Sequence, residues 1–155
     1  MNAWCVDRVT DMAGLFANIN YFNEDISAWN TASVRSMKLM FGSSQVFDYD
    51  INSWDTSSVT DLSYMFMDAR AFNQDISGWD IAKVKTMENM FMGASSFNQN
   101  LCKWRSTIFP YGNSNNIFQG SSCEDTHTPT LMSPNFCQPC GNRNTEMGAG
   151  SHVRI

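Results

Sequence analysis

The sequence predicts an α/β solenoid, a leucine-rich-repeat-like array of 25-residue coils that each contain one strand and one short helix. One observation behind this prediction is a 25-residue repeat that runs without insertion over residues 4–104. The other is that aromatic residues hold the same register, and the tryptophans are Trp4, Trp29, Trp54, Trp79 and Trp104. A constant period of this size indicates units that bury their apolar faces only by stacking on their neighbours.

The short helix is predicted from the segment SSVTDLSYMF, residues 57–66. Val59, Leu62 and Phe66 have the spacing of one helical face. Ser58 and Asp61 resemble a capping box at its start, although the other repeats do not share this pair. The methionines of this face are expected to fill the core rather than to bind a soft metal; they are Met37, Met40, Met65, Met87 and Met90.

The strand is predicted from the segment NQDISGW, residues 73–79. Ile76 lies between Asp75 and Ser77, an alternation that points the isoleucine inward and the polar side chains to solvent. The tryptophan that follows is expected to stack on its equivalents in neighbouring coils. The residues that precede the strand are expected to form a structural ladder that satisfies backbone groups; they are Asn23, Asp48, Asn73 and Asn98.

The predicted binding surface is the strand face, where polar residues recur once per coil. Its columns are Asp25, Asp50, Asp75 and Asn100, with Ser27, Asn52 and Ser77 beside them. Like charges about 5 Å apart on neighbouring strands repel each other, so backbone donors, a cation or a basic partner should offset them. The aspartates are therefore either turn acceptors or a surface that binds a partner or Ca²⁺.

The cysteines predict a stabilised C-terminal cap over residues 105–140, where the repeat register is lost and all the prolines occur. The four cysteines concerned are Cys102, Cys123, Cys137 and Cys140. They can form two disulfides in three pairings, and we favour Cys102–Cys123 because the segment that contains Cys123 should fold back over the last strand. The alternative is a zinc site, with the ligands Cys123, His127, Cys137 and Cys140.

Composition excludes several classes of function. The net charge of -5 argues against a nucleic-acid partner, which would require a basic surface. No apolar run is long enough to span a bilayer, and no signal peptide follows Met1. The chain enters its first repeat partway, at Trp4, and is therefore expected to be a fragment. Residues 141–155 are expected to form a flexible tail.

Catalysis has no support in the sequence, and we predict neither an enzyme nor a cofactor. His127 and His152 both lie outside the repeats, and no nucleophile or phosphate-binding motif is visible. The role of Cys5 and the oligomeric state are not specified by any pattern in the sequence.

The repeat motif F-N-x-D-I-S-x-W-[DN]-T-x-x-V-x-x-M-x-x-M-F over residues 4–104 resembles the BspA-type leucine-rich repeat, also described as a mycoplasma-type 25-residue repeat of unknown function. The segments FNQNLCKW, SSC and SPNFCQPC resemble the cysteine-bearing ends of such arrays in algal and diatom proteins. The resemblance implies an extracellular or cell-surface segment for recognition or adhesion, with a protein or a surface glycan as partner. The alternatives are a structural spacer without a ligand of its own and the zinc site of the cap.

Overall fold

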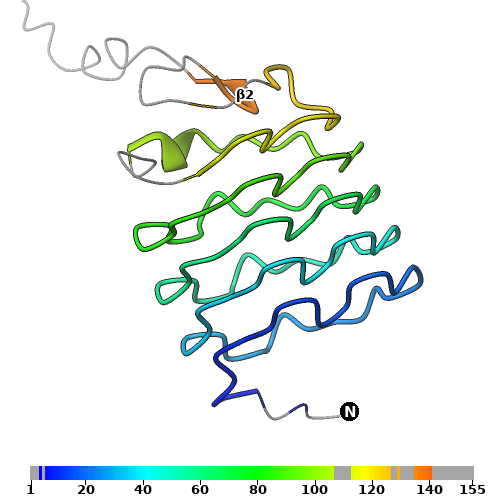
Figure 1. The fold of residues 1–155 in the computed structure, drawn as a ribbon, viewed down its shortest axis with the longest axis vertical. Coiled ribbons are helices and arrows are strands. Elements are labelled where there is room, and N and C mark those ends of the chain that lie inside the picture. The colour runs from blue at the N-terminus through cyan, green and yellow to red at the C-terminus, as the bar shows by residue number, and fades with distance from the viewer. Residues whose placement is uncertain (1–3, 5, 107–112, 127–128, 130–134, 141–155) are drawn as a thin grey trace, which may run out of the picture.

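The computed structural model describes residues 4, 6–106, 113–126, 129 and 135–140. These residues form a pile of flat coils, one repeat per coil, with the N-terminal coil at one end (Figure 1). The regular elements are the 3-10 helix η1 (Cys102–Ser106) and the antiparallel strands β1 (Asn135–Phe136) and β2 (Gln138–Pro139). The other described residues form turns and irregular segments that are joined by isolated parallel bridges.

The predicted α/β solenoid is wrong, because the described residues contain no α-helix and the coils between residues 6 and 101 contain no strand. The segment 57–66 shows why the helix fails. The N–H of Met65 donates to the carbonyl of Leu62 at 3.3 Å, whereas the N–H of Phe66 donates to the carbonyl of Met90 on the next coil at 2.9 Å. Alternate amides therefore bind the neighbouring coil, and the i to i−4 bonds of an α-helix cannot form.

Left-handed residues recur at two fixed positions of each coil and also prevent a helix. Tyr64 and Asp68 have φ values of 61° and 55°, and glycines occupy the equivalent positions of other coils, with φ of 66° at Gly14 and 72° at Gly93. A positive φ at the third residue of a four-residue turn is typical of type II turns. The apolar spacing that predicted a helix arises from these successive turns.

The predicted strand is absent for a similar reason. The N–H of Ser77 donates to Asp75 Oδ1 at 2.9 Å, and the N–H of Trp79 donates to the Ile76 carbonyl at 3.1 Å. These amides serve local turns, so they do not form a strand ladder. The isolated parallel bridges lie elsewhere in the coil and join Asp11, Ser36, Asp61, Thr86 and Asn113 in sequence. Asp61 caps a turn there by accepting from the N–H of Ser63 at 2.8 Å, so the proposed capping box with Ser58 is wrong.

Aromatic rings form the core and confirm the predicted tryptophan column. Trp29 and Trp54 are stacked with ring centroids 6.3 Å apart, and Trp54 and Trp79 are stacked at 6.4 Å. Two phenylalanines of each coil also stack face to face, as Phe66 and Phe72 do at 3.8 Å. The five methionines predicted to be core residues are buried. Each coil thus continues the same apolar columns.

Stacking continues beyond residue 104 with a two-residue offset. Asn113 forms a parallel bridge with Thr86, and the ring of Phe118 stacks on Phe91 at 5.8 Å. Phe118 lies two residues later than the 25-residue period after Phe91 requires, so the stack accommodates an insertion of two residues. The division of the chain at residue 104 remains a prediction.

The disulfides are Cys102–Cys140 and Cys123–Cys137, with Cα atoms 5.5 and 4.5 Å apart. The predicted Cys102–Cys123 pair is therefore wrong. The returning segment places Cys137 at the turn between β1 and β2, where its carbonyl accepts the N–H of Glu124 at 3.0 Å. This contact brings Cys137 to Cys123, so Cys140 at the end of β2 meets Cys102.

No helix among the described residues is long and apolar enough to cross a lipid bilayer. Cys5, His127, His152 and the predicted tail 141–155 lie outside the described residues.

Candidate functional site

The residues proposed from the sequence as a binding surface do lie in register on the outside of the stack. We call them the polar column; its members are Asp25, Asp50, Asp75 and Asn100, with Ser27, Asn52 and Ser77 beside them. The carboxylates and the Asn100 amide are exposed, and each directly precedes a buried Ile or Leu of the core. The buried residue fixes the backbone, so the polar side chain before it recurs once per coil.

Each of these residues closes a local turn through one side-chain oxygen. Oδ1 accepts the N–H of the residue two positions later, at 3.0 Å from Asp25, 2.9 Å from Asp50, 2.9 Å from Asp75 and 2.9 Å from Asn100. This is an Asx-turn. The three aspartates are therefore turn acceptors, which is one of the two roles that the sequence left open for them. Asn100 shows that the turn does not require a charge.

The turns also offset the repulsion expected between stacked carboxylates. The hydroxyl and then the N–H of Ser27 donate to Asp25 and hold its pKa below the ordinary value of 3.8. The N–H and then the hydroxyl of Ser77 lower the pKa of Asp75 in the same way, and the charge of Lys103 adds to the effect. These hydrogen bonds favour the ionised carboxylate. Asp25 and Asp75 therefore remain charged well into the acid range.

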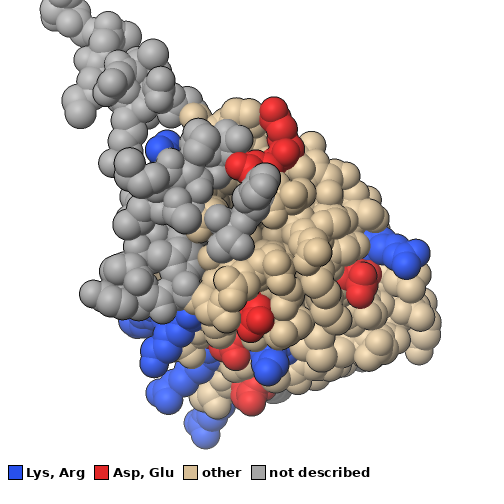
Figure 2. Space-filling model, turned by 45° about the horizontal axis from the view of Figure 1, so that its top comes forward, with Lys and Arg blue, Asp and Glu red and all other residues tan. Residues whose placement is uncertain are grey.

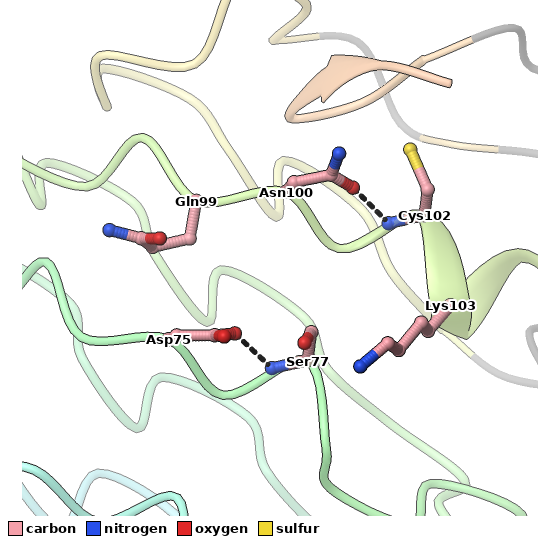
Figure 3. Close-up of a pocket in the computed structure, with 6 residues that line it drawn as sticks. All are labelled: Asp75, Ser77, Gln99, Asn100, Cys102 and Lys103. Atoms are coloured by element: carbon pink, nitrogen blue, oxygen red, sulfur yellow. Dashed lines mark hydrogen bonds between the residues drawn. The ribbon is translucent and has the colours of Figure 1, made fainter. Parts of the chain in front are cut away.

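The polar column leads into a hollow of about 340 Å³ between the third and fourth coils (Figure 3). Its lining residues are Asp75, Ser77, Gln99, Asn100, Cys102 and Lys103. The side chain of Lys103 extends from η1 toward Ser77 across the gap between the coils (Figure 3). The hollow combines a carboxylate, a hydroxyl, two amides and an ammonium group, which suits a polar ligand with both donors and acceptors.

The hollow lies where the repeat changes at one position. In the second coil, the Ser53 hydroxyl donates to the Ser27 carbonyl at 2.9 Å and bridges the two coils. In the third coil this position is Gly78, where an added Cβ would lie 2.9 Å from Asn52 Oδ1, so these coils also fit closely. Lys103 occupies the equivalent position within η1 and leaves the space open.

The predicted asparagine ladder is confirmed and lies two residues before the polar column. Asn23 Oδ1 accepts the N–H of Asp48 at 3.0 Å, Asp48 Oδ1 accepts the N–H of Asn73 at 2.8 Å, and Asn73 Oδ1 accepts the N–H of Asn98 at 2.9 Å. Gln138 Nε2 donates to Asn98 Oδ1, so β2 closes the ladder at the C-terminal end. These side chains are structural and are engaged by their neighbours.

The charged groups do not form a surface of one sign. On the face shown in Figure 2, several Lys and Arg side chains gather at the lower left, while others lie apart from them and the Asp and Glu side chains are dispersed. Within the part of the chain that the structure describes, no three His, Cys, Asp or Glu residues are close enough to hold a metal ion. The zinc alternative is wrong for its three cysteines, because Cys123, Cys137 and Cys140 are in disulfides.

The sequence-based set of surface residues did not include Gln99 and Lys103, which line the hollow. The signal for them was the substitution pattern of one register position, in which Ala28, Ser53 and Gly78 are followed by Lys103. A small residue at this position in three coils and a lysine in the last one indicate that the last coil packs differently.

The comparisons with known proteins agree with the repeat analysis. Residues 1–104 match the model of a family described as "Mycoplasma protein of unknown function, DUF285". None of the curated proteins and none of the solved structures matches the chain. The match covers well over half of the chain and includes the 25-residue repeats, so the protein belongs to this family.

Proposed function

We propose that the chain is a recognition segment of an extracellular or cell-surface protein, and that it binds a macromolecular partner through the polar column. The observation that carries the proposal is that an exposed, in-register row of polar side chains leads into an open polar hollow. The aromatic and methionine side chains hold the coils together. The outer ends of the polar side chains therefore remain available for a ligand.

The compartment is inferred from the cysteines and from the repeat. Two disulfides join the last coils to the C-terminal segment, and disulfides persist in oxidising compartments outside the cytosol. The resemblance of the repeat to BspA-type surface arrays, and of the end to cysteine-bearing algal and diatom proteins, supports the same location and an adhesive role. The partner is a protein segment or a surface glycan that supplies basic or hydroxyl groups to the carboxylates.

The second candidate is a spacer that has no ligand of its own. The observation that favours it is that Oδ1 of each of the three aspartates and of Asn100 is engaged in a turn. In that case the aspartates are selected for backbone geometry and not for recognition.

The two candidates are separated by removing charge without removing the turns. Because Asn100 already makes this turn, the triple variant D25N/D50N/D75N should keep the fold and lose three charges. The matched control D11N/D61N/D80N removes three charges from Asx-turns outside the polar column. Binding to immobilised oligolysine, to a panel of surface glycans and to Ca²⁺ alone is then measured for all three proteins.

Recognition through the polar column predicts that the wild type binds a probe and that the column variant binds it about tenfold more weakly or worse, the equivalent of about 1.4 kcal/mol. The control should bind like the wild type. An equal loss in both variants would show unspecific attraction by net charge and would reject the column. A wild type that binds none of the probes would support the spacer.

A further inference from the structure

The two disulfides differ in their access to solvent. Cys123 and Cys137, the inner disulfide, are 7% and 0% exposed. Cys102 and Cys140, the outer disulfide, are both partly exposed, and Cys102 lines the polar hollow (Figure 3). Attack on a disulfide requires that a thiolate reach one sulfur in line with the S–S bond. A thiol in solution therefore meets the outer disulfide first.

The inner disulfide belongs to the core of the C-terminal end. Cys123 Sγ lies 3.7 Å from the carbonyl oxygen of Phe97, and Glu124 donates its N–H to the Cys137 carbonyl at 3.0 Å. Phe136 of β1 is fully buried, and its carbonyl accepts the N–H of Leu101 at 3.3 Å. Exposure of these sulfurs would require β1 to leave the stack with its aromatic anchor.

The outer disulfide fixes a segment that has fewer buried residues than the segment fixed by the inner disulfide. β2 contributes Gln138, whose amide caps the asparagine ladder at Asn98, and Pro139, which is exposed. Cys102 itself is held by its own turn, because its N–H donates to Asn100 Oδ1 at 2.9 Å. Opening of this bond therefore frees the end of β2 while β1, the inner disulfide and the coils keep their contacts.

We propose that Cys102–Cys140 is a thiol-exchange site, which thiols open while Cys123–Cys137 stays closed, and whose opening frees the end of β2. The inference is independent of any ligand of the polar column. It assigns to Cys102 a chemical role that the repeat does not require, since Ser27, Asn52 and Ser77 occupy the same position in the other coils.

The chemistry is an exchange in two steps with a dithiol as reductant. One thiolate of the dithiol attacks a sulfur of the outer disulfide, forms a mixed disulfide and displaces the other cysteine as a thiolate, which takes up a proton. The second thiol of the reagent then attacks the mixed disulfide and leaves as a cyclic disulfide. The protein gains two thiols, and the dithiol is oxidised by two electrons. The Cys102 thiolate can then attack a small disulfide that enters the hollow, so that a mixed disulfide forms and the other half of the small disulfide leaves as a thiolate and takes up a proton.

The test is a titration of the folded full-length protein with dithiothreitol, followed by alkylation and peptide mapping by mass spectrometry. A parallel sample carries Cys5→Ser, so that Cys5 takes no part in exchange. We expect Cys102 and Cys140 to be labelled at concentrations about tenfold or more below those that label Cys123 and Cys137, because only the latter need subglobal opening. Hydrogen exchange should accelerate at the amides of Gln138 and Cys140, because Pro139 has no amide proton, and should stay slow at Leu101 and Phe136.

Two variants control for the fold. C102S/C140S should melt as the wild type does in its coils and should show fast exchange in β2 with or without dithiothreitol. C123S/C137S should lose protection in β1 and over residues 113–126. Equal reduction of the two disulfides, prior reduction of the inner one, or unchanged exchange in β2 after opening of the outer one would each overturn the proposal.

Discussion

At the scale of single residues, this fold depends on side-chain oxygens that accept backbone amides. Some act within a coil, as Asp50 does toward Asn52, and others act between coils, as Asn73 does toward Asn98. Asp and Asn are interchangeable at both kinds of position, because Asn100 closes a turn and Asp48 takes part in the ladder. Equivalent positions of successive coils thus share the acceptor oxygen, whether or not the side chain is charged.

The ladder residue Asn73 should be the most sensitive of these acceptors. Its Oδ1 accepts the N–H of Asn98 at 2.9 Å and also Nε2 of Gln99 at 3.0 Å. We expect Asn73→Ala to lower the free energy of unfolding by about 1–2 kcal/mol. Asn73→Asp should cost clearly less, because an aspartate does the same at position 48. Urea denaturation of both variants measures the difference, and an equal loss would contradict the ladder as its cause.

Acid should weaken the turns of the polar column. The folded-state pKa values of Asp25 and Asp75 are lowered below 3.8 by donors from Ser27 and Ser77. A lowered pKa contributes stability that is present above 3.8 and is lost as the pH falls through the folded-state value. We expect the Tm of the wild type to fall as the pH is lowered below 3.8, and that of D25N/D75N to fall less. Parallel curves for the two proteins would refute this assignment.

At the scale of elements, the coil is built from turns in which certain residues must be left-handed. Gly93 has φ of 72°, and a Cβ there would collide with the carboxylate of Asp68 on the preceding coil. Gly14 has φ of 66° and open space around its Cβ position. Substitution of the two glycines by alanine therefore distinguishes the cost of the positive φ from the cost of a steric contact.

Gly93→Ala should destabilise the protein by about 1–2 kcal/mol through strain alone and by more through the contact with Asp68. Gly14→Ala should show the strain without the contact. In a double-mutant cycle, Gly93→Ala should cost less unfolding free energy in the Asp68→Ala background than in the wild type, because the contact with the Asp68 carboxylate is then absent. Absence of any recovery would assign the whole effect to φ.

The sequence predicted where residues lie better than it predicted the backbone that carries them. Register follows from identity at 25-residue intervals, so the tryptophan column and the asparagine ladder could both be read directly. The spacing of Val59, Leu62 and Phe66 fits helical periodicity and also fits successive turns with alternate amides bound to the next coil. Periodicity alone does not separate the two, and Tyr64 has a left-handed conformation that its residue type does not signal.

The same limit explains what was missed at the C-terminal end. The disulfide pairing depends on the sharp return between β1 and β2, which are separated by Cys137 alone and have no characteristic glycine turn. Cys137 itself provides the positive φ, at 66°. The hollow is also lined by residues of η1, where the backbone departs from that of the other coils. Lys103 lies in η1, but its residue type does not predict a 3-10 helix.

At the scale of the whole molecule, the stack is less well covered at its first coil than in its middle. Trp4 is 55% exposed, whereas Trp54 is 3% exposed. Leu15 is 42% exposed, although Met40 and Met65 in the same register are fully buried. The first coil therefore has one stacking neighbour among the described residues, and the central coils have two.

Protection against hydrogen exchange should follow this gradient. Amides of the first coil, such as Phe16, donate to the second coil with the same geometry as Phe66 does to the fourth. Even so, we expect the amide of Phe16 to exchange at least about tenfold faster than that of Phe66, because an end coil can open without its neighbours. Equal rates at the two amides would show that the stack opens only as a whole.

The direction of the hydrogen bonds between coils also has a mechanical consequence. They link each coil to the next along the long axis of the pile (Figure 1), so tension applied between the two ends loads one interface at a time. The molecule should then lengthen in equal steps, each releasing 25 residues, or about 85 Å of chain at roughly 3.4 Å per residue. The two disulfides restrict lengthening between Cys102 and Cys140, so the last coils should remain folded under load as an anchor.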